Sequence, residues 1–89
     1  MTESDVNTVP AATATAVLTH LVRSMVDDPD AVQVEASQAR GRIKLEVRVG
    51  PVDLGRVIGR RGRTAQSIRT VVRAAATRDA VEVDVDFAD

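Results

Sequence analysis

Several residue types with distinctive chemistry are missing, or nearly missing, from this sequence. It has no cysteine, tryptophan or tyrosine, and only one phenylalanine and one histidine. Without cysteine, neither a disulfide nor a thiolate metal site can supplement the core, which fits a reducing compartment. Groups that often carry catalysis are also absent, since there is no second histidine and no carboxylate pair in a glycine-rich or strongly apolar setting. We therefore predict no enzyme activity, no bound metal and no cofactor.

The single lysine and the single phenylalanine exclude two further classes of protein. Lys44 lies in a predicted strand, so the phosphate loop of nucleotide hydrolases, which needs lysine directly after glycine, is missing. Phe87 has the spacing of a core residue, which leaves no aromatic side chain on a sheet surface to stack RNA bases. Neither nucleotide hydrolysis nor sheet-based RNA recognition is predicted.

Long apolar segments are absent as well. The longest aliphatic runs, such as residues 16–18 and 74–76, have three residues, whereas a helix needs roughly 20 to cross a bilayer. Residues 1–5 are acidic and polar, unlike the start of a secretory signal peptide. We expect a cytoplasmic protein with no membrane partner.

What remains is the pattern of one small folded domain. Residues 1–9 are polar and show no periodicity, so we predict a disordered tail followed by a single domain over residues 10–89. Within the domain, some segments repeat apolar residues at helical spacing, and others alternate apolar with polar residues as half-buried strands do. The predicted elements, in chain order, are a helix over residues 11–26, strands over 31–37 and 43–49, helices over 52–58 and 63–77, and a strand over 81–87.

This α-β-β-α-α-β order predicts an α+β domain in which one three-stranded sheet is covered on one face by three helices. In the short helix, Val52, Leu54, Val57 and Ile58 are possible core or groove residues. The third strand has acidic residues at its polar positions, so we expect its outward face to be acidic.

Basic charge is concentrated in one part of the chain. The net charge is −1, yet residues 55–78 hold seven of the twelve basic side chains and no acid, and residues 79–89 hold five acids and no base. A chain with this asymmetry is expected to be bipolar. Its basic segment predicts a site for an anionic partner.

The centre of this basic segment is Gly59-Arg60-Arg61-Gly62, between two predicted helices. Glycine tolerates positive φ, so Gly59 and Gly62 allow a tight corner that another backbone can approach. The helix that follows presents unpaired N–H groups and the positive end of its dipole. Arg60 and Arg61 add two guanidinium groups that match phosphate. We therefore predict a phosphate-facing loop, although so short a glycine pattern also occurs as a plain structural corner.

With sheet-based base stacking excluded, one mode of RNA recognition remains. In this mode the glycine loop holds the RNA backbone, and the bases lie on an aliphatic groove. The run Val57-Ile58-Gly59-Arg60-Arg61-Gly62 resembles the signature of the KH domain, in which two helices meet at a G-x-x-G loop. The order of elements resembles the type II form of that domain. Residues 21–30 and 50–77 resemble the small single-KH bacterial RNA-binding proteins called KhpA, and the likeness extends over about residues 14–87.

The resemblance implies a cytoplasmic RNA-binding protein or RNA chaperone that forms a homodimer, or a heterodimer with a larger KH-containing protein called KhpB. In some bacteria the family is connected with cell shape and division. The resemblance also implies that the loop contacts the backbone of single-stranded RNA, with Val57, Ile58 and Ile68 near the bases. With the neighbouring arginines included, the candidate RNA-binding residues are Gly59, Arg60, Arg61, Gly62, Arg56, Arg63, Val57, Ile58, Ile68 and Arg69.

Two other functions stay open at this point. Residues 52–77 are predicted to form two helices around a glycine-containing turn, which is also the outline of a DNA-binding helix-turn-helix. Against this, the first helix is short and the second has few polar base readers besides Gln66. The other alternative is a KH-shaped dimerisation or scaffold module that acts mainly through protein contacts.

Overall fold

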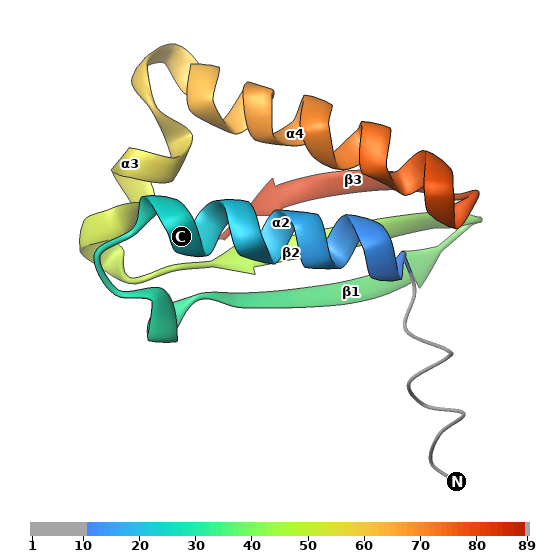
Figure 1. The fold of residues 1–89 in the computed structure, drawn as a ribbon, viewed down its shortest axis with the longest axis horizontal. Coiled ribbons are helices and arrows are strands. Elements are labelled where there is room, and N and C mark those ends of the chain that lie inside the picture. The colour runs from blue at the N-terminus through green and yellow to red at the C-terminus, as the bar shows by residue number, and fades with distance from the viewer. Residues whose placement is uncertain (1–10, 89) are drawn as a thin grey trace, which may run out of the picture.

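The structure, a computed structural model, describes residues 11–88 (Figure 1). Its elements are α2 (Ala12–Met25), β1 (Gln33–Ala39), β2 (Arg42–Arg48), α3 (Leu54–Ile58), α4 (Arg63–Ala76) and β3 (Glu82–Phe87), with short 3₁₀ turns at Pro29–Ala31, Pro51–Asp53, Arg60–Gly62 and Thr77–Asp79. The predicted order of helices and strands is therefore confirmed. The predicted tail over residues 1–9, and Pro10 and Asp89 at the ends of the predicted domain, lie outside the described residues.

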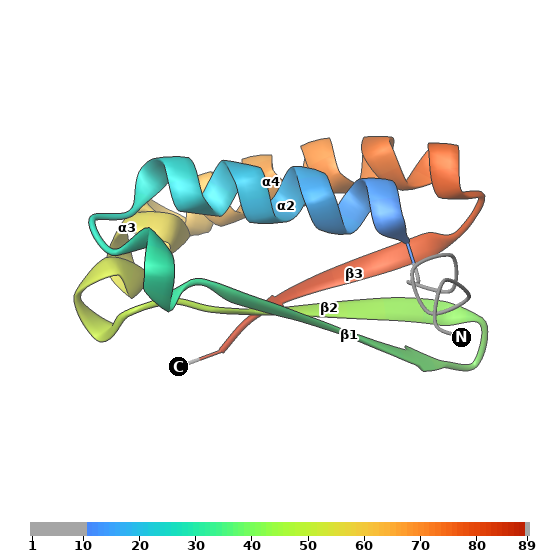
Figure 2. The same ribbon diagram turned by 60° about the horizontal axis from the view of Figure 1, so that its bottom comes forward.

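The sheet has the order β1-β2-β3 and combines two kinds of pairing. β1 and β2 form an antiparallel hairpin closed by Arg40 and Gly41, whose φ values of 56° and 80° are both positive. β3 pairs with β2 in parallel, because the chain crosses over the sheet through α3 and α4 before it returns. The helices all lie on one face of the sheet (Figure 2). The predicted two-layer α+β architecture is confirmed.

The core lies between the helices and the inner face of the sheet. β2 alternates buried Ile43, Leu45 and Val47 with more exposed residues, as the period of a half-buried strand requires. Each helix buries one apolar stripe against them. The helical members of the core are Ala14, Leu18 and Val22 from α2, Val57 from α3, and Ile68, Val72 and Ala76 from α4. No helix within residues 11–88 is long and apolar enough to cross a membrane.

Ion pairs join β2 to β3 on the outer face of the sheet. Nη2 of Arg42 lies 2.8 Å from Oδ1 of Asp84 and its Nη1 contacts Glu82, while Nζ of Lys44 lies 3.3 Å from Oδ2 of Asp86. The hydrogen bond from Arg42 is the main reason why the pKa of Asp84 is lowered. The acids of β3 are thus paired with the bases of β2. The outward side chains of β3 are acidic, as expected from the sequence, and parallel pairing places the basic side chains of β2 beside them.

Two local predictions differ from the structure. The first strand begins at Gln33, later than predicted, because Pro29–Ala31 forms a 3₁₀ turn. Val52, predicted as a possible core or groove residue, is 85% exposed. The reason is that Pro51–Asp53 is also a 3₁₀ turn, and it buries the side chain of Asp53 in place of that of Val52.

The N-terminus of α2 is capped by a residue from the far end of the chain. Ala11, which precedes the helix, has a left-handed conformation with φ of 52° and provides no side-chain cap. Instead, the carboxylate of Asp79 accepts the N–H groups of Thr13 at 3.1 Å and of Ala14 at 3.0 Å. Burial alone would raise the pKa of Asp79, but these hydrogen bonds outweigh it and the pKa is lowered. Asp79 therefore ties α2 to the turn after α4.

Asp79→Ala is expected to lower the free energy of unfolding at pH 7 by about 1–2 kcal/mol, because two N–H groups at the helix terminus lose their acceptor. Since the pKa of Asp79 is lowered in the folded state, its contribution is complete above the unfolded pKa of about 3.9 and is lost as pH falls through the folded value. Urea unfolding of parent and variant at pH 7 and about pH 2 measures both effects. Asp30→Asn, a change at a side chain that is 96% exposed, is the control. A deficit that stays the same at the acidic pH would contradict this account.

Candidate nucleic-acid interface

The glycine loop turns the chain sharply between α3 and α4. Gly59 follows the end of α3 with φ 77° and ψ 173°, a conformation that is essentially restricted to glycine. Arg61 and Gly62 then both have left-handed conformations, with φ of 56° and 71°. α4 begins directly afterwards at Arg63. The loop is therefore compact, and three of its four residues, Gly59, Arg61 and Gly62, have positive φ values.

The two glycines are needed for different reasons. A Cβ atom added to Gly59 would lie 2.2 Å from Oγ1 of Thr64 and 2.9 Å from its backbone nitrogen, far inside van der Waals contact. A Cβ added to Gly62 would meet no atom within 4 Å. Position 59 requires glycine because the first turn of α4 approaches it too closely for a Cβ atom. Position 62 favours glycine only because its φ is positive. The space above Gly62 is open to a ligand.

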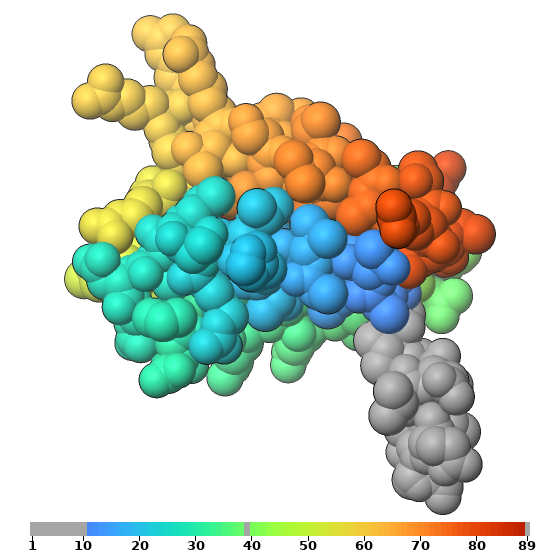
Figure 3. Space-filling view, viewed as in Figure 1, coloured from blue at the N-terminus to red at the C-terminus, as the bar shows by residue number. Residues whose placement is uncertain are grey.

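Three arginines at this corner have no partner in the described part of the chain. Arg60, Arg61 and Arg63 are exposed, and none of them forms a side-chain hydrogen bond or ion pair there. In the space-filling view the segment that carries the loop, drawn in yellow, extends away from the rest of the domain (Figure 3). Positive charge is therefore concentrated and unneutralised at the loop.

Arg56, also predicted to contact RNA, is engaged within the protein. Its Nη1 lies 2.9 Å from Oδ1 of Asp27 and 3.8 Å from Oδ1 of Asp53. The hydrogen bond to Asp27 is the main reason why the pKa of Arg56 is raised. Asp53 is completely buried, and its two oxygens accept the N–H groups of Asp27 and Asp28, each at 3.2 Å. This cluster joins the start of α3 to the end of α2, and so it positions α3 beneath the loop.

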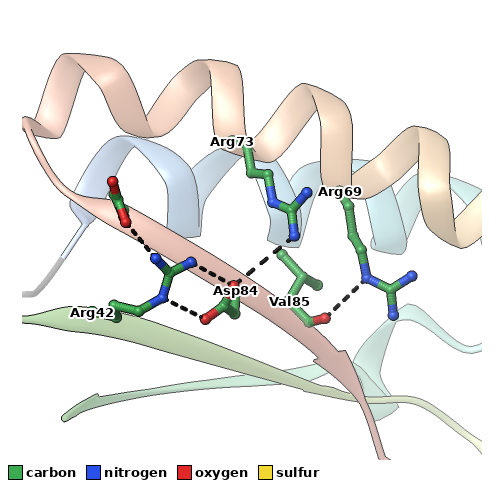
Figure 4. A network of polar contacts seen from close by, with 6 residues as sticks. Arg42, Arg69, Arg73, Asp84 and Val85 are labelled. Atoms are coloured by element: carbon green, nitrogen blue, oxygen red, sulfur yellow. Dashed lines mark hydrogen bonds and ion pairs between the residues drawn. The ribbon is translucent and has the colours of Figure 1, made fainter. Parts of the chain in front are cut away.

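Arg69 has intramolecular partners as well. Its Nε donates to the carbonyl oxygen of Val85 at 3.1 Å, and its guanidinium carbon lies 5.4 Å from the centre of the Phe87 ring. The next arginine along the helix, Arg73, lies 3.9 Å from Asp84. Both arginines reach from α4 to β3 (Figure 4). Arg69 therefore ties α4 to the edge of the sheet, more than one and a half helical turns from the start of α4 at the loop.

The apolar residues predicted near the bases are mostly buried. Val57 and Ile68 have 0% and 2% of their surface exposed, so their side chains belong to the core. Ile58 is half-buried and is the one apolar residue of the predicted set that reaches the surface beside the loop. Periodicity indicated correctly that all three are apolar-stripe residues. It could not indicate how much of each stripe the neighbouring elements cover.

Two features of this region were not identified from the sequence. One is the buried carboxylate of Asp53, whose only signal was an acid just before a helix, a common capping position. The other is a shallow apolar groove of about 110 Å³ between α2 and α4, beside which Val71 is 47% exposed. Its signal was Val71, the first residue of the pair Val71-Val72, because Val72 belongs to the buried stripe of α4 and Val71 does not. The groove is lined by Leu21, Met25, Thr64, Ser67, Ile68 and Val71.

Comparison with known proteins shows what kind of domain carries this loop. A family model described as "KhpA/KhpB, KH domain" matches residues 15–87. The chain belongs to the KhpA/KhpB KH-domain family. Its order of elements and its mixed three-stranded sheet are consistent with the type II form, so the resemblance seen in the sequence is confirmed.

Relatives that match most of this KH domain are named as RNA-binding proteins. The chain is 59% identical over 69 residues to the RNA-binding protein KhpA of Leifsonia xyli subsp. xyli, covering 76% of this chain and 90% of that protein. It is 55% identical over 71 residues to the RNA-binding protein KhpA of Streptomyces coelicolor, covering 75% and 90%.

A solved structure with little sequence similarity has the same fold. The crystal structure of Era from Aquifex aeolicus matches 83% of this chain with a TM-score of 0.62 and 15% identity, and the match covers 29% of the Era chain. At that identity the likeness shows the fold alone.

Proposed function

We propose that this KH domain binds RNA without catalysis and holds the backbone of a single strand at the loop of Gly59, Arg60, Arg61 and Gly62. The observation that carries the proposal is the group of three exposed arginines at this corner, Arg60, Arg61 and Arg63. Within residues 11–88 their side chains have no hydrogen-bond or ion-pair partner. Membership of the KhpA/KhpB family, with relatives named as RNA-binding proteins, supports RNA as the ligand.

Phosphate is the part of RNA that suits this loop. Each guanidinium can donate two parallel hydrogen bonds to one phosphate. The start of α4 adds backbone N–H donors and the positive end of a helix dipole. The open space above Gly62 leaves room for the strand. With about three phosphates neutralised on a single strand, log affinity should fall with log salt concentration with a slope of about −2.

A single strand fits this surface better than a duplex. Domains that recognise double-stranded RNA need a basic surface long enough to span successive grooves. Here Arg56 and Arg69 have partners within the protein, so the basic surface at the loop consists of only three unpaired arginines and is short. Because no exposed aromatic side chain within residues 11–88 adds stacking energy, one domain should bind weakly and with little sequence preference.

Weak binding by one domain favours action in pairs, because two linked sites raise the overall affinity. In this proposal the domain pairs with a second KH chain, either a second copy of itself or a larger KhpB-type protein. The pair then serves as a cytoplasmic RNA chaperone in post-transcriptional regulation. A link to cell shape and division rests on the family resemblance alone.

Of the two alternatives, the protein-contact module has an observation in its favour. The exposed Val71 and the apolar groove beside it provide a surface that RNA phosphates would not use. The DNA-binding helix-turn-helix has little support, since α3 has five residues and forms barely more than one turn. RNA binding remains the better proposal because the unpaired positive charge lies at the glycine loop.

The double variant Arg60→Asp and Arg61→Asp is expected to weaken RNA binding by about a hundredfold or more, because it replaces two attractive charges by two repulsive ones where a phosphate must approach. Its stability should change by only about ±0.5 kcal/mol, since both side chains are exposed and aspartate tolerates the left-handed conformation at position 61. Fluorescence anisotropy with a short single-stranded RNA and thermal melting measure the two effects.

The matched control is the double variant Arg40→Asp and Arg78→Asp, which makes the same change of charge at two exposed residues near the opposite end of the domain. It should retain most of the affinity, because the loss at the loop is local and not an effect of net charge. If the loop variant melts like the parent and binds RNA as well as the parent, the loop is only a structural corner.

A preference for duplex DNA over single-stranded RNA in competition would favour the helix-turn-helix alternative.

A further inference from the structure

Thr64, the second residue of α4, has a hydroxyl group with no hydrogen-bond partner in the described part of the chain. Two other threonines in the helices donate their hydroxyl to the backbone carbonyl four residues earlier, Thr19 at 2.8 Å and Thr70 at 3.0 Å. Thr64 forms no such bond with a described residue, although it is half-buried. Its hydroxyl therefore keeps both its donor and its acceptor capacity for a ligand.

The hydroxyl of Thr64 is directed at the glycine loop. Its Oγ1 lies 2.2 Å from the position that a Cβ on Gly59 would occupy, whereas the Cβ of Thr64 lies 2.7 Å from that position. The methyl carbon of Thr64 is not among the three nearest atoms. Because glycine has no side chain, residue 59 leaves this hydroxyl uncovered on the side of the loop. The hydroxyl thus lies next to the backbone that is proposed to hold RNA.

Thr64 also carries the only hydroxyl side chain of residues 54–66, which comprise α3, the loop and the first turn of α4. The guanidinium groups of the loop can only donate hydrogen bonds, and they attract the phosphates of RNA and DNA alike. The carbonyl oxygens of Gly59 and Arg60 already accept N–H groups from further along the loop. A neutral ligand group that lies beside a phosphate, and that both donates and accepts, therefore has a suitable partner in Thr64.

The 2′-hydroxyl of ribose is a group of this kind. It is present in RNA and absent from DNA, and it allows a protein to distinguish the two at a given position. In a single strand each 2′-hydroxyl lies next to the phosphate on the 3′ side of its sugar. A phosphate held by the arginines of the loop therefore brings a 2′-hydroxyl to the same corner of the domain, where it can donate to a threonine hydroxyl or accept from it.

We propose that the hydroxyl of Thr64 forms a hydrogen bond with one ribose 2′-hydroxyl of the strand held at the loop, and that this contact makes the domain prefer RNA to single-stranded DNA. The inference rests on the proposed function, because it requires a strand at the loop. It adds a specificity-determining residue to that function. The arginines hold the phosphates of either backbone, and Thr64 distinguishes the sugar.

Two single strands with identical bases, uracil included, test the proposal when one has ribose and the other deoxyribose. In fluorescence anisotropy the parent should bind the RNA strand about three- to tenfold more tightly, as expected for one net hydrogen bond. Thr64→Val removes the hydroxyl and keeps a β-branched side chain against Gly59. It should lose this factor of affinity for RNA and keep its affinity for DNA, so that the variant no longer distinguishes the strands.

Three further variants separate the hydroxyl from the rest of the side chain. Thr64→Ala also removes the hydroxyl and should abolish the preference for RNA, whereas Thr64→Ser keeps the hydroxyl and should retain the preference. Thr70→Val is the matched control, because the hydroxyl that it removes from the same helix is already bonded to the backbone. It should leave both affinities unchanged. Thermal melting shows that each variant is folded, and Thr64→Val should melt like the parent, since no described polar group loses a partner.

Equal binding of the two strands by the parent would overturn the inference. A loss of affinity for both strands in Thr64→Val would also overturn it, because the threonine would then only support the loop. A preference for RNA that persists in Thr64→Val and Thr64→Ala would mean that another group distinguishes the sugar. None of these results contradicts RNA binding at the loop. That proposed function fails separately, if the double variant of Arg60 and Arg61 to aspartate binds both strands as well as the parent.

Discussion

Gly59→Ala is expected to lower the free energy of unfolding by about 3 kcal/mol or more, and the melting temperature by roughly 12–24 °C. A methyl group at this position would lie 2.2 Å from Oγ1 of Thr64, and moving that side chain would not be enough, since the backbone nitrogen of Thr64 is only 2.9 Å away. The backbone at position 59, with φ of 77° and ψ of 173°, adds strain for any residue that has a Cβ. The start of α4 must therefore shift.

Gly62→Ala is the matched control, because it makes the same chemical change in the same loop. With no atom within 4 Å of the added Cβ, it incurs only the strain of a positive φ, about 1 kcal/mol or roughly 4–8 °C. Thermal melting of both variants gives the comparison. Equal losses of stability at the two glycines would mean that the close contact between Gly59 and Thr64 is not what makes glycine necessary there.

Asp53→Ala is expected to destabilise the domain by about 3 kcal/mol, because the N–H groups of Asp27 and Asp28 lose their acceptor in a part-buried site. Arg56 would keep its salt bridge with Asp27 but would lose the second carboxylate, which lies in the turn before α3. Since this cluster positions α3, the variant should also bind RNA more weakly at temperatures where it is still folded. Urea unfolding and RNA anisotropy measure the two consequences.

Two further changes show whether the effect belongs to the buried carboxylate. Asp53→Asn keeps one acceptor oxygen but places an NH₂ group toward a backbone N–H, so an intermediate loss is expected. Asp30→Ala removes a carboxylate whose side chain is 96% exposed, in an ion pair of 3.9 Å with Arg23, and should change stability by less than about 0.5 kcal/mol. If Asp53→Ala were no more destabilising than Asp30→Ala, the buried cluster would have no role in holding α3.

The prediction of the elements succeeded where the signal was local. Ile43, Leu45 and Val47 alternate with polar residues because one face of β2 is buried, and that alternation is visible without a structure. Ile68 and Val72 recur at helical spacing for the corresponding reason in α4. Errors occurred at segments too short for a period to develop. Val52 is an example, since a 3₁₀ turn of three residues decided its exposure.

The partners of the arginines could not be predicted from the local sequence. Seven arginines lie between residues 55 and 78, and from this concentration the sequence predicted a site. It could not separate Arg60 from Arg69, because the partner of each depends on which distant residues lie nearby. Arg69 meets Val85 and Phe87 only after β3 has returned alongside β2.

By itself, the sequence determined the order of elements, the apolar stripes and the glycine loop, since each depends on residues close together along the chain. The tertiary structure alone decided that the acids of β3 are paired with the bases of β2, that Asp79 caps α2, and that Asp53 holds the end of α2. These contacts join residues far apart in sequence. Their formation depends on parallel pairing and on helix packing, which no local pattern specifies.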